Sequence, residues 1–250
     1  MKIKGNTILI TGGATGIGFA LAEAMSKAGN KVIICGRRAD KLAAAKANLP
    51  QIGIKVCDVT NLKAREELFS WVKENYPDLN ILINNAGIQK MINLKKGTKE
   101  LASGGDEIET NLAAPVYLSA LFAPWLAKKK EAAIINVSSG LGFIPIAAMP
   151  VYCATKAGLH SFTISLRHQL KATGVKVFEI IPPQVDTELG RGTTAEEAEE
   201  YRGIPAVEVA KAVMKALSKD EYEIAVGDAK GLVEGAKTNF QPVFDNMNNW

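Results

Sequence analysis

Short apolar runs recur along the chain, separated by longer stretches in which apolar residues have helical spacing. Most of the short runs are apolar throughout rather than alternating, which is typical of strands buried on both faces of a parallel sheet. They lie at residues 7–10, 31–35, 53–57, 80–84, 132–137, 175–181 and 222–226. The sequence therefore predicts a parallel sheet of about seven strands.

The intervening stretches predict amphipathic helices. In the first, residues 16–28, Ile17, Leu21 and Met25 recur at helical intervals. Strands that alternate with helices indicate an α/β fold, and we expect a single doubly wound Rossmann domain over residues 1–250, with helices on both faces of the sheet. The other helices are predicted at 40–48, 61–75, 106–127 (locally disturbed by Pro115) and 152–172.

Two segments depart from this alternation. Residues 188–204 are polar, contain glycine and are acidic in the middle, and we expect them to form an inserted substrate loop. The tail, residues 237–250, carries aromatic residues without regular spacing, so we expect it to pack on a neighbouring subunit or to fray.

Composition and charge narrow the class of protein. The 250 residues are 47% hydrophobic and 22% charged, as is ordinary for a globular protein, and the net charge is only +4. The lysine clusters at 95–96 and 128–130 have no interleaved aromatic residues, so nucleic-acid binding is not predicted. Three scattered cysteines suggest reduced thiols rather than a metal site. We find neither a signal peptide nor a run of ~18 apolar residues, and expect a cytoplasmic protein without a membrane span.

A glycine-rich loop, TGGATGIG at 11–18, joins the first predicted strand to the first helix. Glycines allow sharp turns and a close approach of a ligand, and the free N–H groups at a helix start favour an anion such as a pyrophosphate. The alternative is a tight turn that binds nothing. The residues predicted to contact a dinucleotide here are Gly12, Thr15, Gly16, Ile17 and Gly18.

The second strand ends in Gly36-Arg37-Arg38, where folds that bind NAD usually carry an acidic residue for the ribose. Two guanidinium groups suit a 2′-phosphate, which favours NADP(H) over NAD(H), unless both arginines are ordinary surface charges. Asp58 and Val59, after the third strand, are placed to border the adenine, although Asp58 could equally cap the next helix.

Tyr152 precedes Lys156 by four residues, which places both side chains on one helix face. A cation beside a phenol favours the phenolate and lowers the phenol's pKa from its ordinary value of ~10. Such a tyrosine can donate a proton to a carbonyl oxygen in reduction and remove it in oxidation. Taken alone, the pair could also be a buried tyrosine and a surface lysine.

These motifs together resemble a family. The glycine-rich loop, NNAG at 84–87, Asn111, Ser139 and the Tyr152–Lys156 pair have the order and spacing of short-chain dehydrogenases/reductases of about 250 residues, over essentially the whole chain. IIPPQVDTEL (180–189) with NNAGIQ further resembles the DltE-like branch, found with genes for D-alanylation of teichoic acids. Pro182-Pro183 departs from the Pro-Gly of many members.

The resemblance implies an oxidoreductase acting on a small carbonyl compound or secondary alcohol. Ser139 would hold the substrate oxygen, with Ser138 as the alternative, and Asn111 would organise a water that links Lys156 to solvent. Lys156 would also bind the nicotinamide ribose. Further cofactor contacts are implied for Asn85, Ala86, Gly87, Pro182, Val185 and Thr187.

The substrate itself is hardly readable from the sequence. Leu141, Phe143 and Met149 could form an apolar pocket wall or pack only against protein. The resemblance implies a homodimer or homotetramer formed through the fourth and fifth helices. A weakly catalytic or non-catalytic NADP(H)-binding regulator of teichoic acid D-alanylation is the alternative function. A sugar-nucleotide epimerase or dehydratase is disfavoured, because about 60 residues follow Thr187.

Overall fold

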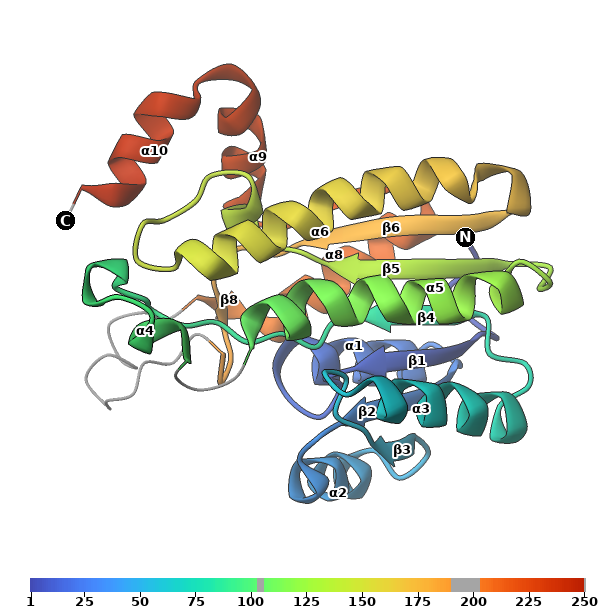
Figure 1. Ribbon diagram of the computed structural model, residues 1–250. Helices are drawn as coiled ribbons and strands as arrows, with labels where there is room; N and C mark the ends of the chain where they lie inside the picture. The colour runs from blue at the N-terminus through green and yellow to red at the C-terminus, as the bar shows by residue number, and fades with distance from the viewer. Residues whose placement is uncertain (103–105, 190–202, 250) are drawn as a thin grey trace.

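A computed structural model of the chain describes residues 1–102, 106–189 and 203–249. Within them, seven parallel strands form one twisted sheet in the order β3-β2-β1-β4-β5-β6-β9 (Figure 1). The predicted Rossmann-like sheet is confirmed, with each predicted strand in place. The strands are β1 Thr7–Thr11, β2 Lys31–Gly36, β3 Gly53–Val56, β4 Ile81–Asn84, β5 Ala132–Val137, β6 Val175–Ile181 and β9 Glu223–Ala225; β7 Val185–Asp186 and β8 Ile204–Pro205 form a separate small pair.

Helices cover both faces of the sheet. The α-helices are α1 Gly16–Lys27, α2 Ala39–Asn48, α3 Leu62–Asn75, α4 Lys99–Ala102, α5 Ala114–Leu126, α6 Pro150–Gln169, α8 Ala206–Ser218, α9 Ala229–Thr238 and α10 Phe240–Asn248. Short turns of other helix types are η1 Leu94–Lys96, η2 Glu109–Ala113, η3 Gly140–Gly142 and η4 Lys171–Thr173. Apolar residues of α1, α2 and α8 pack on one face, and those of α3, α5 and α6 pack on the other.

The uninterrupted apolar strands follow from this layering. Along β1, Ile8 and Ile10 belong to the core on the α1 side, while Leu9 between them belongs to the core on the α5 side. Successive side chains of a strand point to opposite faces, so a strand with helices on both sides needs apolar residues at every position. Full burial of each such side chain contributes about 1.5–3 kcal/mol.

The helix predicted at 106–127 is interrupted next to Pro115. The turn before it, η2, is a π-helix, in which the Ala114 N–H bonds to the Glu109 carbonyl five residues back. Pro115 has no N–H for the carbonyl of Asn111, four residues earlier, which makes a widened turn favourable at this point. Asn111 therefore lies in an irregular turn at the edge of the sheet rather than in a regular helix.

The C-terminal tail folds back onto its own chain. It forms α10, which packs against α9 where Val243 meets Gly235 (Figure 1). The Asn248 side chain donates to the Pro145 carbonyl at 3.2 Å and accepts from the Ala147 N–H at 2.6 Å. The tail is therefore helical rather than frayed, and its packing on a neighbouring subunit stays a prediction. Most of the expected loop at 188–204 falls on residues 190–202, outside the described residues.

No helix in the described parts of the chain combines the length and the apolar character needed to cross a bilayer.

Candidate active site

A cavity of about 320 Å³ opens at the carboxyl ends of the strands, next to β1 and β4. The strand order reverses between these two strands, which is the place where open α/β sheets bind ligands. Most residues predicted to contact a cofactor line this cavity: Gly12, Thr15, Gly16, Ile17, Gly18, Arg37, Arg38, Asp58, Val59, Asn85, Ala86, Gly87, Tyr152, Lys156, Pro182 and Thr187. The exception is Val185, which is buried in β7, is paired with Ile204 and packs into the core.

The glycine-rich loop forms a tight cradle on the wall of the cavity. Gly12 and Gly16 have positive φ angles of 62° and 56°. A Cβ on Gly12 would lie 2.8 Å from the Ala86 Cα, and one on Gly16 would lie 3.0 Å from the Thr187 Cγ2. The loop leads into the start of α1, where N–H groups and the helix dipole favour an anion. The cradle therefore fits the pyrophosphate of a dinucleotide.

Gly18→Ala tests this close packing. The new methyl would lie 2.4 Å from the Gly12 carbonyl oxygen and 2.5 Å from the Asn85 Nδ2, which itself donates to that carbonyl at 3.1 Å. We expect the loop to shift and NADPH affinity to fall about 10- to 100-fold, because hydrogen bonds to a charged phosphate contribute about 1.5–3 kcal/mol each. Fluorescence titration of NADPH measures the loss. Gly231→Ala, where no described atom lies within 4 Å of the added carbon, is the matched control. Equal affinity of the two variants would contradict the cradle.

Tyr152 and Lys156 are both buried on α6, at the wall of this cavity. The Lys156 Nζ lies 5.6 Å from the centroid of the Tyr152 ring and donates to the Val137 carbonyl at 2.8 Å. Ser139, at the end of β5, hydrogen-bonds the Tyr152 phenol and so favours its ionised form, which lowers its pKa. The structure thus places Ser139 next to Tyr152, which lines the cavity together with Lys156.

The pKa values of the pair differ from the expectation. Burial raises the pKa of Tyr152 to about 12, outweighing the opposing hydrogen bond from Ser139. Burial also lowers the pKa of Lys156 to about 8, and the nearby Glu179 carboxylate opposes that effect. We expected Lys156 to bring the phenol's pKa down, but desolvation dominates here and the ammonium group binds the Val137 carbonyl. The phenol therefore keeps its proton at neutral pH, which is the form that can act as an acid.

Asn111 lies beside the pair and holds the segment after β4. Its Oδ1 accepts from the Ile88 N–H at 2.9 Å, and its Nδ2 donates to the Ile88 carbonyl at 2.8 Å and to the Thr155 Oγ1 at 3.2 Å. A Cβ on Gly87 would lie 3.4 Å from the Asn111 Oδ1 and 3.6 Å from the Lys156 Nζ. The side chains of Asn111 and Lys156 therefore both approach the backbone at Gly87.

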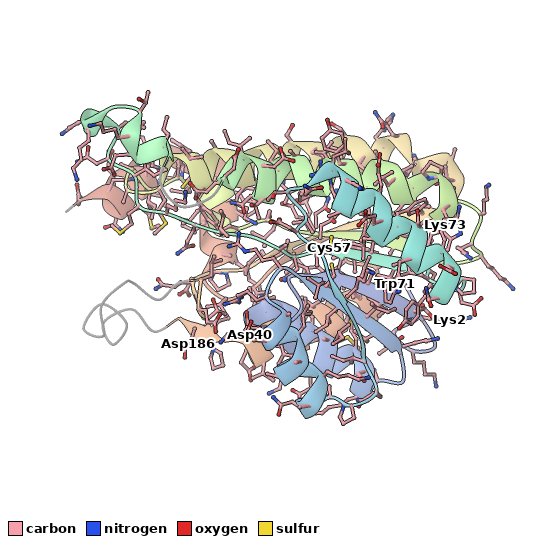
Figure 2. All side chains as sticks on the ribbon, turned by 60° about the horizontal axis from the view of Figure 1, so that its bottom comes forward. Lys2, Asp40, Cys57, Trp71, Lys73 and Asp186 are labelled. Atoms are coloured by element: carbon pink, nitrogen blue, oxygen red, sulfur yellow. The ribbon has the colours of Figure 1, made fainter. Side chains whose placement is uncertain are left out.

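The other end of the cavity carries an ion cluster that the sequence did not reveal in full. Arg38 donates to Glu188 at 2.8 Å and to the Thr15 hydroxyl at 3.3 Å, and Lys41 donates to Glu188 at 2.9 Å. Figure 2 shows the start of α2, marked by Asp40, next to the end of β7, marked by Asp186. Hydrogen bonds from Lys41 and Arg38 lower the pKa of Glu188. The spacing of Arg38 and Lys41, three apart at a helix start, was a usable signal; nothing local pointed to Glu188.

The predicted substrate residues stand apart from this cavity. The described wall includes Ser138 but not Ser139, Leu141, Phe143 or Met149. Phe143 packs on the His160 ring with centroids 4.3 Å apart. A hydrogen bond of 2.9 Å from the Ile92 N–H to the Ala148 carbonyl joins the two backbone segments that follow β4 and η3.

The chain belongs to the short chain dehydrogenase family, whose sequence model matches residues 6–198. It is therefore an NAD(P)-dependent oxidoreductase of that family. It is 50% identical over 248 residues to the uncharacterized oxidoreductase DltE of Bacillus subtilis, covering 99% of this chain and 98% of that protein. An uncharacterized oxidoreductase of Staphylococcus aureus is 32% identical over 216 residues, which cover 86% of this chain and 91% of that one.

Solved structures agree with the assignment. A short chain dehydrogenase from Burkholderia cenocepacia, in complex with NADP, is 27% identical, with a TM-score of 0.85 and coverage of 99% of both chains. A short chain dehydrogenase/reductase from Burkholderia phymatum, in complex with NAD, has the same TM-score at 20% identity and covers 97% of this chain and 95% of its own. The second likeness concerns the fold alone.

Proposed function

We propose that the chain is an NADP-dependent reductase of a small carbonyl compound, with Tyr152 as the general acid. The observation that carries this proposal is the buried Tyr152 at the wall of a cavity that is also lined by Arg37 and Arg38. The phenol carries its proton at neutral pH, as an ordinary tyrosine does, and burial, which raises its pKa to about 12, preserves that form. The reverse reaction would need a phenolate, which this environment disfavours.

NADPH, when bound, supplies the hydride. Tyr152 donates its phenolic proton to the carbonyl oxygen as negative charge develops there. Ser139, hydrogen-bonded to the phenol, orients the same oxygen and stabilises its charge. Lys156 stabilises the phenolate that is left and holds the nicotinamide ribose. Thr187, in contact distance of the glycine-rich loop, borders the nicotinamide end.

The preference for NADP rests on the charges at the end of β2. Arg37 and Arg38 line the cavity where folds that bind NAD carry a carboxylate. Glu188 bridges Arg38 and Lys41 with its two oxygens, and a 2′-phosphate, which also presents oxygens to cations, would take that place. The Burkholderia cenocepacia relative was solved in complex with NADP, which supports the same choice.

Binding and turnover assays test the proposal. The purified protein is titrated with NADPH and with NADH, and is then screened against aldehydes and ketones by following consumption of the cofactor. We expect tighter binding of NADPH and turnover of at least one carbonyl compound. Tighter binding of NADH would overturn the cofactor preference. Binding of NADPH without any turnover would favour the non-catalytic regulator instead.

A homo-oligomer formed through α5 and α6 is part of the proposal. Tyr117 on α5 and Ile164 on α6 are 50% and 44% exposed, so each helix presents a large side chain that a partner subunit would cover. Light scattering after size-exclusion chromatography measures the mass of the particle. The cytoplasm remains the proposed location, with which the three buried, unpaired cysteine thiols agree.

A further inference from the structure

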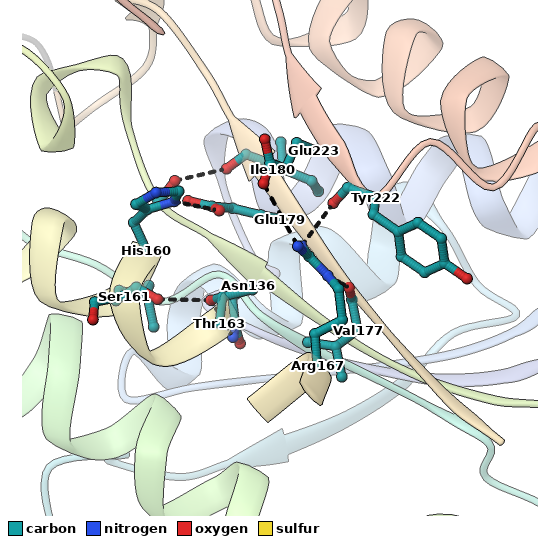
Figure 3. Close-up of polar contacts among 12 residues, drawn as sticks. Asn136, His160, Ser161, Thr163, Arg167, Val177, Glu179, Ile180, Tyr222 and Glu223 are labelled. Atoms are coloured by element: carbon teal, nitrogen blue, oxygen red, sulfur yellow. Dashed lines mark hydrogen bonds and ion pairs between the residues drawn. The ribbon is translucent and has the colours of Figure 1, made fainter. Parts of the chain in front are cut away.

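A carboxylate is buried between the sheet and α6, the helix that carries Tyr152 and Lys156. Glu179, in β6, is fully buried, and its Oε2 lies 2.8 Å from the Nδ1 of His160 on α6 (Figure 3). Its other oxygen, Oε1, is also buried and has no hydrogen-bond partner among the described residues. Burying a carboxylate that is only half satisfied is costly, so a chain that merely needed to fill this space would use an apolar residue.

The place of this carboxylate relates it to Lys156. Tyr152, Lys156 and His160 follow one another at intervals of four residues on α6, so they share the helix face that meets the sheet. The carbonyl that binds the Lys156 ammonium belongs to Val137, which pairs with Ile180 in the sheet. Glu179 is the residue before Ile180 on β6. The carboxylate therefore sits at the strand position next to the lysine's anchor.

We propose that Glu179, held in place by His160, is a positioning residue that keeps Lys156 protonated and so supports proton transfer by Tyr152. The proposal rests on the function proposed above for Tyr152 and Lys156. Burial lowers the pKa of Lys156 to about 8 even with the opposing influence of Glu179, so losing that carboxylate would lower it further. The counter-charge of Lys156 thus lies between α6 and the sheet, on the same helix face as the lysine.

The other charged groups near His160 and Glu179 already have hydrogen-bond or ion-pair partners. The Arg167 guanidinium, on α6, donates to the Val177 and Tyr222 carbonyls at 2.8 and 3.2 Å and lies 3.6 Å from the Glu223 carboxylate of β9 (Figure 3). Glu179 and Glu223 raise the pKa of His160, while burial and Arg167 lower it, and the hydrogen bond with Glu179 is the largest influence. Glu179 is thus the carboxylate that hydrogen-bonds His160 and whose charge raises the pKa of Lys156.

The protonation state of His160 makes the effect of Glu179 on Lys156 depend on pH. Protonated His160 offsets the charge of Glu179, while neutral His160 leaves the carboxylate unopposed. As pH rises, His160 releases its proton, and the field of Glu179 on Lys156 strengthens as the lysine begins to lose its own. The sign follows from the lysine: its charge is present below its pKa and is lost as pH rises through about 8.

Glu179→Gln tests the proposal. The substitution keeps the shape and a hydrogen bond to His160 but removes the charge. We expect the alkaline limb of the pH profile of NADPH-dependent reduction to move about one unit lower, since a nearby opposite charge shifts a pKa by one to three units. Glu223→Gln, the same change at an exposed carboxylate near His160, should leave the limb in place. Glu179→Asp, which keeps the charge, should also leave the limb near that of the wild type.

A second readout needs no turnover. The chain has two histidines, so the imidazole signals of His160 and His168 can be separated by NMR titration. We expect Glu179→Gln to lower the pKa of His160 and to leave His168 unchanged. An unshifted alkaline limb, or an equal loss of activity at every pH, would overturn the role of Glu179.

Two controls keep the outcomes distinct. If Glu179→Gln does not fold, the double variant His160→Leu, Glu179→Met replaces the pair by apolar side chains. The same downward shift of the alkaline limb is then expected, and an unshifted limb again overturns the proposal.

If Tyr152→Phe retains turnover, the proposed function itself fails. If Tyr152→Phe is inactive while the limb of Glu179→Gln is unshifted, only the role of Glu179 fails.

Discussion

Tyr152→Phe is expected to lower the turnover number for carbonyl reduction by about 10²- to 10⁴-fold, the range that general acid–base catalysis contributes. The substitution removes the phenolic hydroxyl and with it the proton that burial retains at neutral pH. It leaves the ring, which packs in the core, unchanged. Affinity for NADPH should stay within a few-fold of the wild type, because the cradle around Gly12, Gly16 and Gly18 is untouched.

Single-turnover kinetics with saturating NADPH measure this loss without interference from product release. Tyr222→Phe, the same substitution at a partly exposed tyrosine just before β9, is the matched control and should retain full activity. Thermal unfolding of both variants checks that the fold is intact. A Tyr152→Phe protein with wild-type turnover would show that another group supplies the proton.

Replacing both Arg37 and Arg38 with alanine is expected to weaken NADPH binding by about 10- to 100-fold and to leave NADH binding nearly unchanged. A hydrogen bond to a charged group contributes about 1.5–3 kcal/mol, and 1.4 kcal/mol is a factor of ten in affinity. Arg38 is held by Thr15 and Glu188, and Arg37 is exposed, with no ion pair in the described part of the chain. Both guanidinium groups are therefore able to meet a 2′-phosphate.

Glu188→Gln should act in the opposite direction. Its carboxylate now binds Arg38 and Lys41 and would repel an incoming phosphate, so its neutralisation should raise NADPH affinity a few-fold, as expected for exposed ion pairs. Isothermal titration with both cofactors at low and high salt measures these effects. Lys27→Ala, which removes an exposed cation paired with Glu23, is the control. Equal losses for NADPH and NADH in the double arginine variant would contradict the phosphate site.

Features with a local cause could be predicted from the sequence. Strands covered on both faces must be apolar at every position, so the order of strands and helices can be read directly. The glycine-rich loop and the Tyr152–Lys156 pair each consist of residues that lie close together in the sequence, within one or two helical turns. The break before Pro115 also follows from a local property, the missing N–H.

Contacts between distant segments could not be predicted. Glu188 meets Arg38 across 150 positions, and Glu179 on β6 meets His160 on α6. The tail has no marked periodicity, yet Asn248 binds the loop at 145–147 through its side-chain amide. Such pairs are fixed by which strands and helices become neighbours.

The sequence by itself determined the parallel sheet and singled out the glycine-rich loop and Tyr152, the proton donor that we propose, because each is encoded in consecutive or helically spaced residues. Only the tertiary structure decided the charge state of that tyrosine. The spacing of Tyr152 and Lys156 predicts an acidified phenol, whereas burial raises its pKa to about 12 and lowers that of the lysine. The desolvation of a group depends on all the atoms packed around it. The residues that neighbour Tyr152 and Lys156 in the sequence do not determine that packing.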